Sequence, residues 1–214
     1  MTIFVHPAKW SRELYTLVEI GVFKGDNAVA LIGLLNARSV QARYVGFDLF
    51  EIVEEFYLQH REEREIYDHP DYPYWEFKTG GHSLAQVSTK LAALLQPDRF
   101  VLVPGDSTQT VPTNRELICN ADFVYIDGCH DYEIVEQDWQ NVRAHFKENA
   151  GLIVAFDDVT SPGVMWLRGE IRRDNTDLLV LDLNFNQFFV CSTRIPLRRR
   201  LALETLGFVG RWHG

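Results

Sequence analysis

The stretch YTLVEIGVFKGDNAVALI, Tyr15–Ile32, decides the fold of this 214-residue chain. Its first half is an apolar run that ends around Glu19 and Gly21, and Gly25 follows four residues later. Apolar residues at helical spacing then begin at Ala28. In α/β sheets, a strand, a glycine turn and a helix in this order present backbone N–H groups to a small ligand. The stretch therefore predicts the first strand–helix unit of an α/β domain.

The glycine turn has the spacing G-x-x-x-G, which is neither the G-x-G-x-x-G of dinucleotide-binding folds nor a phosphate-gripping P-loop. Such a turn suits a ligand with an amino acid end and a ribose better than it suits a pyrophosphate. Glu19 is placed to accept from an ammonium group or to orient the turn, and Gly21 lets the backbone approach the ligand. Asp26 or Asn27 is expected to cap the helix. The competing interpretation is an ordinary strand–helix turn of a doubly wound fold.

Composition and charge exclude several classes of protein. The hydrophobic share of 46% and the charged share of 24% are ordinary for one globular α/β domain of this length. A net charge of −9 weighs against nucleic acids and anionic membranes as partners, because Lys and Arg drive phosphate binding. The three cysteines form no C-x-x-C pair, which favours a reducing, cytoplasmic location. The N-terminus lacks signal-peptide features, and no apolar run approaches the ~20 residues that span a bilayer.

Strand–helix alternation continues along the chain and predicts a doubly wound α/β fold. Helices are expected over 84–95, over 132–146 and around Trp166. Apolar runs predict the later strands at 42–47, 100–103, 121–126, 151–156, 178–183 and 187–191. We therefore expect a mostly parallel, seven-stranded sheet in a single domain over residues 1–214. The run at 121–126 is predicted to be central because it is almost continuously apolar, and the last two strands should form an antiparallel pair at one edge.

Residues 49–78 interrupt the alternation with an insertion rich in acids and aromatic residues. The run DHPDYPYW, Asp68–Trp75, contains two prolines and cannot form a regular helix. An insertion after the second strand lies on the side of the sheet where ligands bind. It is interpreted as a lid or an aromatic substrate wall, with a packed surface excursion or a dimer contact as the alternative. The 194–214 tail and the oligomeric state are not assigned, and a homo-oligomer remains one option.

Acids follow several of the predicted strands. Asp48 ends the second strand at the distance from the glycine turn where α/β nucleotide sites bind the ribose hydroxyls. Asp106 and Ser107 follow the third strand and could offer a carboxylate, a hydroxyl and N–H groups to an adenine edge. A solvated strand end and a plain turn are the alternatives at these two places.

Asp127, Asp157 and Asp158 end the fourth and fifth strands. If these strands are neighbours, their ends lie about 5 Å apart, and the repulsion between three carboxylates calls for a cation. Oxygen ligands suit Mg²⁺, Mn²⁺ or Ca²⁺ better than zinc. Each aspartate could instead cap the helix that follows it. His130 is within reach of a substrate proton and suits general base catalysis, with a structural, hydrogen-bonded histidine as the alternative.

Five motifs together resemble class I S-adenosylmethionine-dependent methyltransferases. The resemblance covers roughly residues 14–159, and it is strongest to the branch with Y-I-D-G-x-H-x-Y-E followed by G-x-I-x-x-x-D-D. That branch contains macrolide-sugar O-methyltransferases and cephalosporin-hydroxylase-like proteins, and it is distantly similar to catechol O-methyltransferase. The motifs are LVEIGVFKGDNAVALI, YVGFDLFE, VPGDSTQTVP, FVYIDGCHDYE and GLIVAFDD.

The resemblance implies a Rossmann-like methyltransferase fold and a role for each strand end. S-adenosylmethionine would be bound by Glu19, Gly21, Val22, Phe23 and Gly25 at its methionine part, by Asp48 and Leu49 at its ribose, and by Asp106, Ser107 and Asp127. Mg²⁺ would be bound by Asp127, Asp157 and Asp158. The metal would hold two oxygens of a hydroxylated substrate, one of which attacks the sulfonium methyl group in line.

One departure from the resemblance affects catalysis. Relatives often carry an acid where this chain has Cys129, which leaves His130, with Asp127, as the catalytic candidates. The leading hypothesis is a Mg²⁺-assisted O-methyltransferase that acts on a hydroxyl group of a small molecule, such as a sugar or glycoside. The alternatives are a metal-independent methyltransferase with His130 as base, and a non-catalytic binding protein that keeps the cofactor fold.

Overall fold

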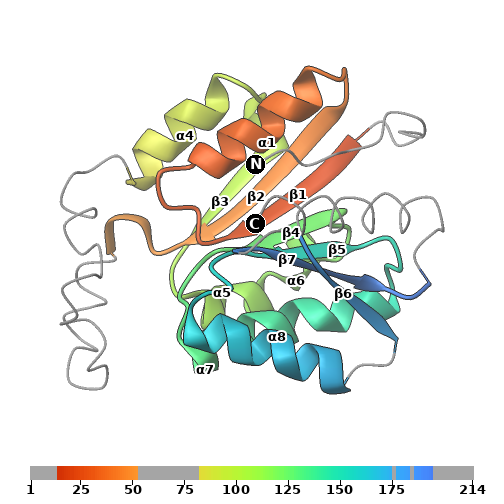
Figure 1. Cartoon of the computed structure of the whole chain (residues 1–214). Coiled ribbons are helices and arrows are strands. Elements are labelled where there is room, and N and C mark those ends of the chain that lie inside the picture. Colours follow the sequence, from red (N-terminus) through yellow and green to blue (C-terminus); the bar gives the residue numbers. More distant parts are fainter. Residues whose placement is uncertain (1–13, 53–81, 175–176, 184–185, 195–214) are drawn as a thin grey trace.

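A seven-stranded sheet forms the centre of the computed structural model, which describes residues 14–52, 82–174, 177–183 and 186–194 (Figure 1). Its strands are β1 Leu14–Ile20, β2 Gln41–Asp48, β3 Phe100–Pro104, β4 Phe123–Ile126, β5 Ile153–Phe156, β6 Leu178–Asp182 and β7 Phe188–Ser192. They follow the order β3-β2-β1-β4-β5-β7-β6. The pairs among β1 to β5 are parallel, whereas β7 is antiparallel to both β5 and β6. The predicted fold class is therefore confirmed.

Helices cover both faces of this sheet (Figure 1). One face carries α1 Asp26–Asn36 and α4 Leu84–Ala92. The other carries α5 Ser107–Thr113, α6 Arg115–Ile118, α7 Tyr132–Arg143 and α8 Pro162–Asp174. Short 3-10 turns lie at η2 Phe50–Ile52, η5 Pro97–Arg99 and η6 Ala144–Lys147. The strand order reverses between β1 and β4, and ligands of open α/β sheets bind beyond the carboxyl ends of the strands at such a point.

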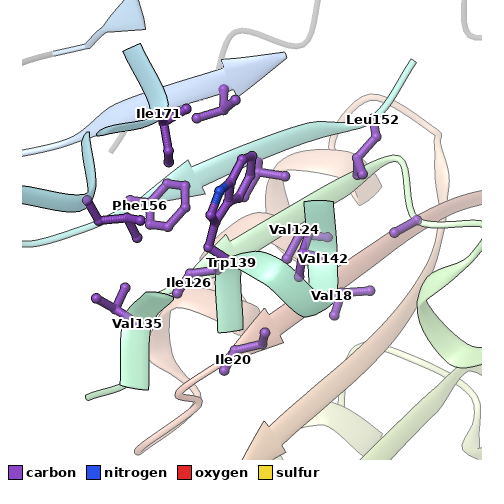
Figure 2. Packing of buried hydrophobic residues seen from close by; sticks show 14 of the residues in the cluster. Val18, Ile20, Val124, Ile126, Val135, Trp139, Val142, Leu152, Phe156 and Ile171 are labelled. Atoms are coloured by element: carbon purple, nitrogen blue, oxygen red, sulfur yellow. The ribbon is translucent and has the colours of Figure 1, made fainter. Parts of the chain in front are cut away.

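Alternating side chains along the strands supply two hydrophobic cores, one on each face. Val18 and Ile20 of β1 belong to the cluster that includes residues of α7 and α8. Leu17, the residue before Val18, belongs to the cluster that includes residues of α1 and α4. In the first cluster the rings of Trp139 and Phe156 pack with centroids 5.8 Å apart (Figure 2). Each such buried side chain contributes about 1.5–3 kcal/mol, so these cores fix the strand ends that carry the site.

The predicted elements differ from the observed ones mainly at their ends. The run at 121–126 contains the central strand β4, all of whose residues are buried, as expected. The prediction that Asp26 or Asn27 caps α1 is wrong, because the N-cap residue is Gly25 in a left-handed conformation, without a side-chain cap. The third strand is followed by the two helices α5 and α6, where only a turn was expected.

Several predictions fall on residues that are not described. The insertion at 49–78 is described only up to Ile52, and the 194–214 tail only at Arg194. The prediction of a single domain over residues 1–214 therefore stays a prediction. Among the described residues, no helix has both the length and the apolar character that a membrane-crossing segment needs.

Candidate active site

The ends of β1 and β4 meet so closely that only glycine fits between them. A Cβ atom on Gly21, whose φ is +88°, would lie 2.2 Å from the carbonyl oxygen of Asp127. Backbone hydrogen bonds fix this approach, because Gly21 N donates to Phe47 O at 2.9 Å and Asp127 N donates to Ile20 O at 2.8 Å. The glycine turn and the first acid of the aspartate cluster are thus neighbours at the point where the strand order reverses.

Asp48, at the end of β2, accepts hydrogen bonds from the glycine turn on the side of β1 opposite β4. Its Oδ2 accepts from the backbone N–H of Val22 at 2.7 Å and of Phe23 at 2.8 Å, and its Oδ1 accepts from Phe50 N at 2.6 Å. Phe23 and Phe50 both have a φ of +50°, a left-handed conformation that costs energy and gathers at functional sites. Because a carboxylate offers about four lone pairs, Asp48 keeps acceptor capacity for a ligand.

Glu19, near the end of β1 and two residues before Gly21, is buried, with 1% of its surface exposed. Its Oε2 accepts from the hydroxyl of Tyr44, while its Oε1 has no hydrogen-bond partner among the described residues. Burial raises the pKa of Glu19 to about 8, and the charges of Asp127 and Asp48 act in the same direction. Tyr44 opposes this rise, as does Asn27 nearby. One buried oxygen of Glu19 is therefore unpartnered at a place where sequence reasoning expects an ammonium group.

Asp106 and Ser107 begin α5 after β3. The Oδ1 of Asp106 caps the helix by accepting from Thr108 N at 2.9 Å and from Thr108 Oγ1 at 2.8 Å. The Ser107 hydroxyl donates to Oδ2 of Asp138 in α7 at 3.1 Å. Burial raises the pKa of Asp138 to about 7, although the Ser107 bond acts against it. The sequence did carry a signal for Asp138, because it falls at helical spacing among the buried residues of α7.

Asp127, His130 and Asp158 form a cluster in which one ligand atom from each lies within 4.8 Å of the others. His130 Nε2 lies 3.5 Å from Asp158 Oδ2 and 3.9 Å from Asp127 Oδ1. Burial alone would lower the pKa of His130, but the carboxylates of Asp127 and Asp158 outweigh it and raise the pKa above its usual value. Burial also raises the pKa of Asp127, whose Oδ2 accepts from Asn27 Nδ2 at 3.1 Å.

Asp157 is not part of this cluster, although the sequence placed it there with Asp127 and Asp158. Its Oδ2 accepts from the hydroxyl of Tyr125 and from Gln187 Nε2, and its Oδ1 accepts from Asn186 Nδ2. His130 takes the third position instead. The capping alternative does not apply to Asp127, because the N-cap residue of α7 is Asp131, which makes no side-chain cap bond.

Sequence reasoning missed the residues that support these acids. Tyr44 and Tyr125 looked like ordinary strand residues, Asn186 like part of a turn, and Gln187 like the first residue of the last strand. Their only signal is indirect, since polar groups at the ends of central strands need partners when they are buried. Those partners come from positions 25 to 32 residues away in the chain and are known only once the strands are paired.

The chain was compared with protein families, curated sequences and solved structures. The sequence model of a family described as a methyltransferase domain matches residues 18–159. No curated protein sequence matches the chain. The match to the family runs from β1 to the turn after β5, so it includes every residue of the cluster and of the glycine turn.

Three solved structures are similar in fold. A cofactor-bound protein from MTB, Rv0187, is 14% identical with a TM-score of 0.52, over 85% of this chain and 73% of that chain. The SAH-bound methyltransferase PaMTH1 from Podospora anserina is 14% identical with a TM-score of 0.50, over 83% and 71%. The MycE methyltransferase of the mycinamycin biosynthetic pathway, in complex with Mg, SAH and mycinamycin VI, is 14% identical with a TM-score of 0.50, over 85% and 45%. At these identities the likeness shows the fold.

Proposed function

This chain belongs to the methyltransferase domain family, whose fold class uses S-adenosylmethionine, and from that premise we propose that it methylates a hydroxyl group of a small molecule. The observation that carries the proposal is the Asp127–His130–Asp158 cluster, which lies directly beside the glycine turn. A methyl donor in the turn would bring its reactive group next to acids and a base. Positioning of two reactants in this way is a large part of catalysis.

The glycine turn and the strand ends around it fit S-adenosylmethionine. The unpartnered Oε1 of Glu19 fits the ammonium group of the methionine part, and the absence of a side chain at Gly21 allows a close backbone approach. Asp48 accepts three hydrogen bonds and retains acceptor capacity for one ribose hydroxyl, with Leu49 beside it. At the adenine end we assign Asp106 and Ser107. The binding set is completed by Val22, Phe23, Gly25 and Asp127.

The chemistry of the cluster fits a divalent cation. Two carboxylates suit Mg²⁺ or Mn²⁺, and both Asp127 and Asp158 direct an oxygen at His130. When bound, such a cation supplies positive charge that stabilises a deprotonated acceptor oxygen. His130 takes the proton from the acceptor hydroxyl. The acceptor oxygen then forms a bond to the methyl carbon of the donor as the carbon–sulfur bond of the donor breaks. The products are a methyl ether and S-adenosylhomocysteine.

The acceptor that we propose is a sugar or a glycoside. Two findings support this class: the sequence motifs resemble those of macrolide-sugar O-methyltransferases, and MycE, whose fold is similar, was solved with mycinamycin VI. This chain spans 45% of MycE, so the activity of that whole protein is carried over only as a proposal.

Isothermal titration with S-adenosylhomocysteine tests the cofactor assignment. We expect binding by the native protein and none by Asp48→Ala, which loses both the ribose acceptor and the bonds that hold the turn. Asp98→Ala, in η5 before the start of β3 and away from the carboxyl ends of the strands, is the matched control and should bind normally. A folded native protein that does not bind S-adenosylhomocysteine would refute the assignment.

Chelation separates the two catalytic versions of the proposal. With a glycoside acceptor, we expect EDTA to abolish methyl transfer and added Mg²⁺ or Mn²⁺ to restore it. Transfer that is unaffected by EDTA, and that His130→Ala abolishes, would favour the metal-independent version with His130 as base. Cofactor binding without turnover over a broad panel of acceptors would instead indicate a binding protein.

A further inference from the structure

The start of β7 lies beside the acids that end β5, because these two strands are antiparallel neighbours. Phe188, the first residue of β7, pairs with Phe156, the last residue of β5. Asn186 and Gln187 therefore stand opposite Asp157 and Asp158. A backbone hydrogen bond from Val159 N to Asn186 O, at 2.9 Å, ties the two segments together just beyond the sheet.

The side chain of Asn186 bridges the two aspartates. Its Nδ2 donates to Asp158 Oδ1 at 2.8 Å and to Asp157 Oδ1 at 3.0 Å. Its Oδ1 accepts from Thr160 Oγ1 at 3.2 Å, which fixes the orientation of the amide, since a reversed amide would present its oxygen to two carboxylates. Asn186 thus places a donor group between two negative charges, where a cation would otherwise be expected.

The bonds to Asp157 use all of its acceptor capacity. Its carboxylate accepts four hydrogen bonds, from the Tyr125 hydroxyl, Gln187 Nε2, Asn186 Nδ2 and the backbone N–H of Asp158. An ionised carboxylate has about four lone-pair sites, so no site is left for a metal ion. Asp158 differs, because its Oδ2 faces His130 at 3.5 Å. Its left-handed backbone, with a φ of +50°, turns it away from the path of β5.

We propose that Asn186 and Gln187 are positioning residues that hold Asp157 out of the metal ligands and aim Asp158 at Asp127 and His130. This inference rests on the proposed function, and it assigns the cation to Asp127 and Asp158 rather than to three aspartates. The β6–β7 strand pair thereby becomes part of the active site, although none of its residues needs to touch the substrate.

Metal binding by the whole chain tests the direction of the effect. We expect Asn186→Ala to weaken Mn²⁺ binding, measured by electron paramagnetic resonance, by about 10- to 100-fold, as is usual for groups that orient metal ligands. Asn186→Leu, which keeps the size of the side chain but cannot donate to Asp158, should weaken it at least as much. If Asp157 is a ligand that Asn186 only restrains, Asn186→Ala would tighten Mn²⁺ binding, and tightening by either variant overturns the proposal. Asn120→Ala, beside Cys119 and outside the site, is the matched control.

A thermal double-mutant cycle tests the same contacts without a metal. Asn186→Ala should lower Tm by about 2–4 °C in the native chain, and by less than about 1 °C in Asp157→Asn/Asp158→Asn, where the repulsion between the carboxylates is gone. Equal lowering in both backgrounds would overturn the proposal even if the native protein binds no Mn²⁺. Binding of S-adenosylhomocysteine by every variant, followed in parallel, shows whether the cofactor assignment stands independently.

Discussion

Glu19 carries a proton in the free protein at neutral pH, because its pKa is about 8 and lies above its ordinary value. An ammonium group at its unpartnered Oε1 would stabilise the carboxylate and lower that pKa again. Binding of S-adenosylhomocysteine at pH 7 should therefore release close to one proton. Titration calorimetry in two buffers with different ionisation enthalpies measures this release. Glu19→Gln should abolish the buffer dependence, and heats that do not depend on buffer in the native protein would contradict the assignment.

At the scale of single residues, the sequence locates the acids but does not show which of their carboxylates are free to bind a ligand. Asp127 and Asp158 are foreseeable because Asp127 directly follows β4 and Asp158 is the second residue after β5. The sequence does not show that Asp157 lies outside the cluster, because this depends on hydrogen bonds donated by Tyr125 and by residues after β6. Whether a carboxylate is free to bind a ligand depends on the hydrogen bonds it already accepts, and these follow from tertiary pairing rather than from local pattern.

Individual helices and strands were predictable where apolar residues recur with the period of that structure. The strands and α7 follow such periods, so their positions were anticipated to within a few residues. By contrast, α5 has the sequence STQTVPT, in which the only buried residue is Val111 and Pro112 lies inside the helix. It begins because Asp106 caps it. At α1, a left-handed Gly25 replaces the expected cap, because the chain must turn sharply under the site.

The start of α8 supports the loop that carries His130, and two glycines of this helix provide a matched test. A Cβ on Gly163 would lie 2.3 Å from the carbonyl oxygen of His130 and 2.6 Å from Tyr132 N, whereas a Cβ on Gly169 would meet nothing within 4 Å. We expect Gly163→Ala to destabilise the fold by about 1–3 kcal/mol, since the helix or the loop must shift. Gly169→Ala should instead stabilise it by about 0.5–1 kcal/mol, because alanine favours the helix.

Urea unfolding measures both changes on the same helix. The shift in Gly163→Ala should also lower methyl transfer, because it displaces the His130 loop, whereas Gly169→Ala should leave transfer unchanged. Equal stability of the two variants would show that α8 does not pack on this loop as described.

The arrangement of the whole molecule accounts for the site. Parallel strands bring their carboxyl ends to one edge, so the convergence of acids from β1, β2, β4 and β5 followed from strand–helix alternation alone. Alternation could not reveal that β7 enters between β5 and β6 and brings Asn186 to the same edge. That placement is set by the antiparallel pairing of β7 with the distant strand β5, for which the chain carries no local signal, whereas the pairing of β6 with β7 was predicted.

Stability of the molecule as a whole should fall as pH rises above about 6.5. Two buried acids have raised pKa values in the folded state, about 8 for Glu19 and about 7 for Asp138, because burial disfavours their charged forms. In the unfolded chain both are already ionised at pH 6.5, so folding takes up protons and becomes less favourable with pH until the folded pKa values are passed. The slope is at most about 1.4 kcal/mol per pH unit for each group.

We therefore expect Tm to fall by several degrees between pH 6.5 and pH 9, measured by calorimetry at constant ionic strength. Asp138→Asn keeps an oxygen that can accept from Ser107 but removes the carboxyl group, so its decline with pH should be shallower, chiefly below pH 7. Asp98→Asn, in η5 away from the sheet's carboxyl ends, should keep the native slope. A Tm that rises over this range would contradict the raised pKa values of the two buried acids, because ionisation of an acid that is buried on folding can only destabilise the folded state as pH increases.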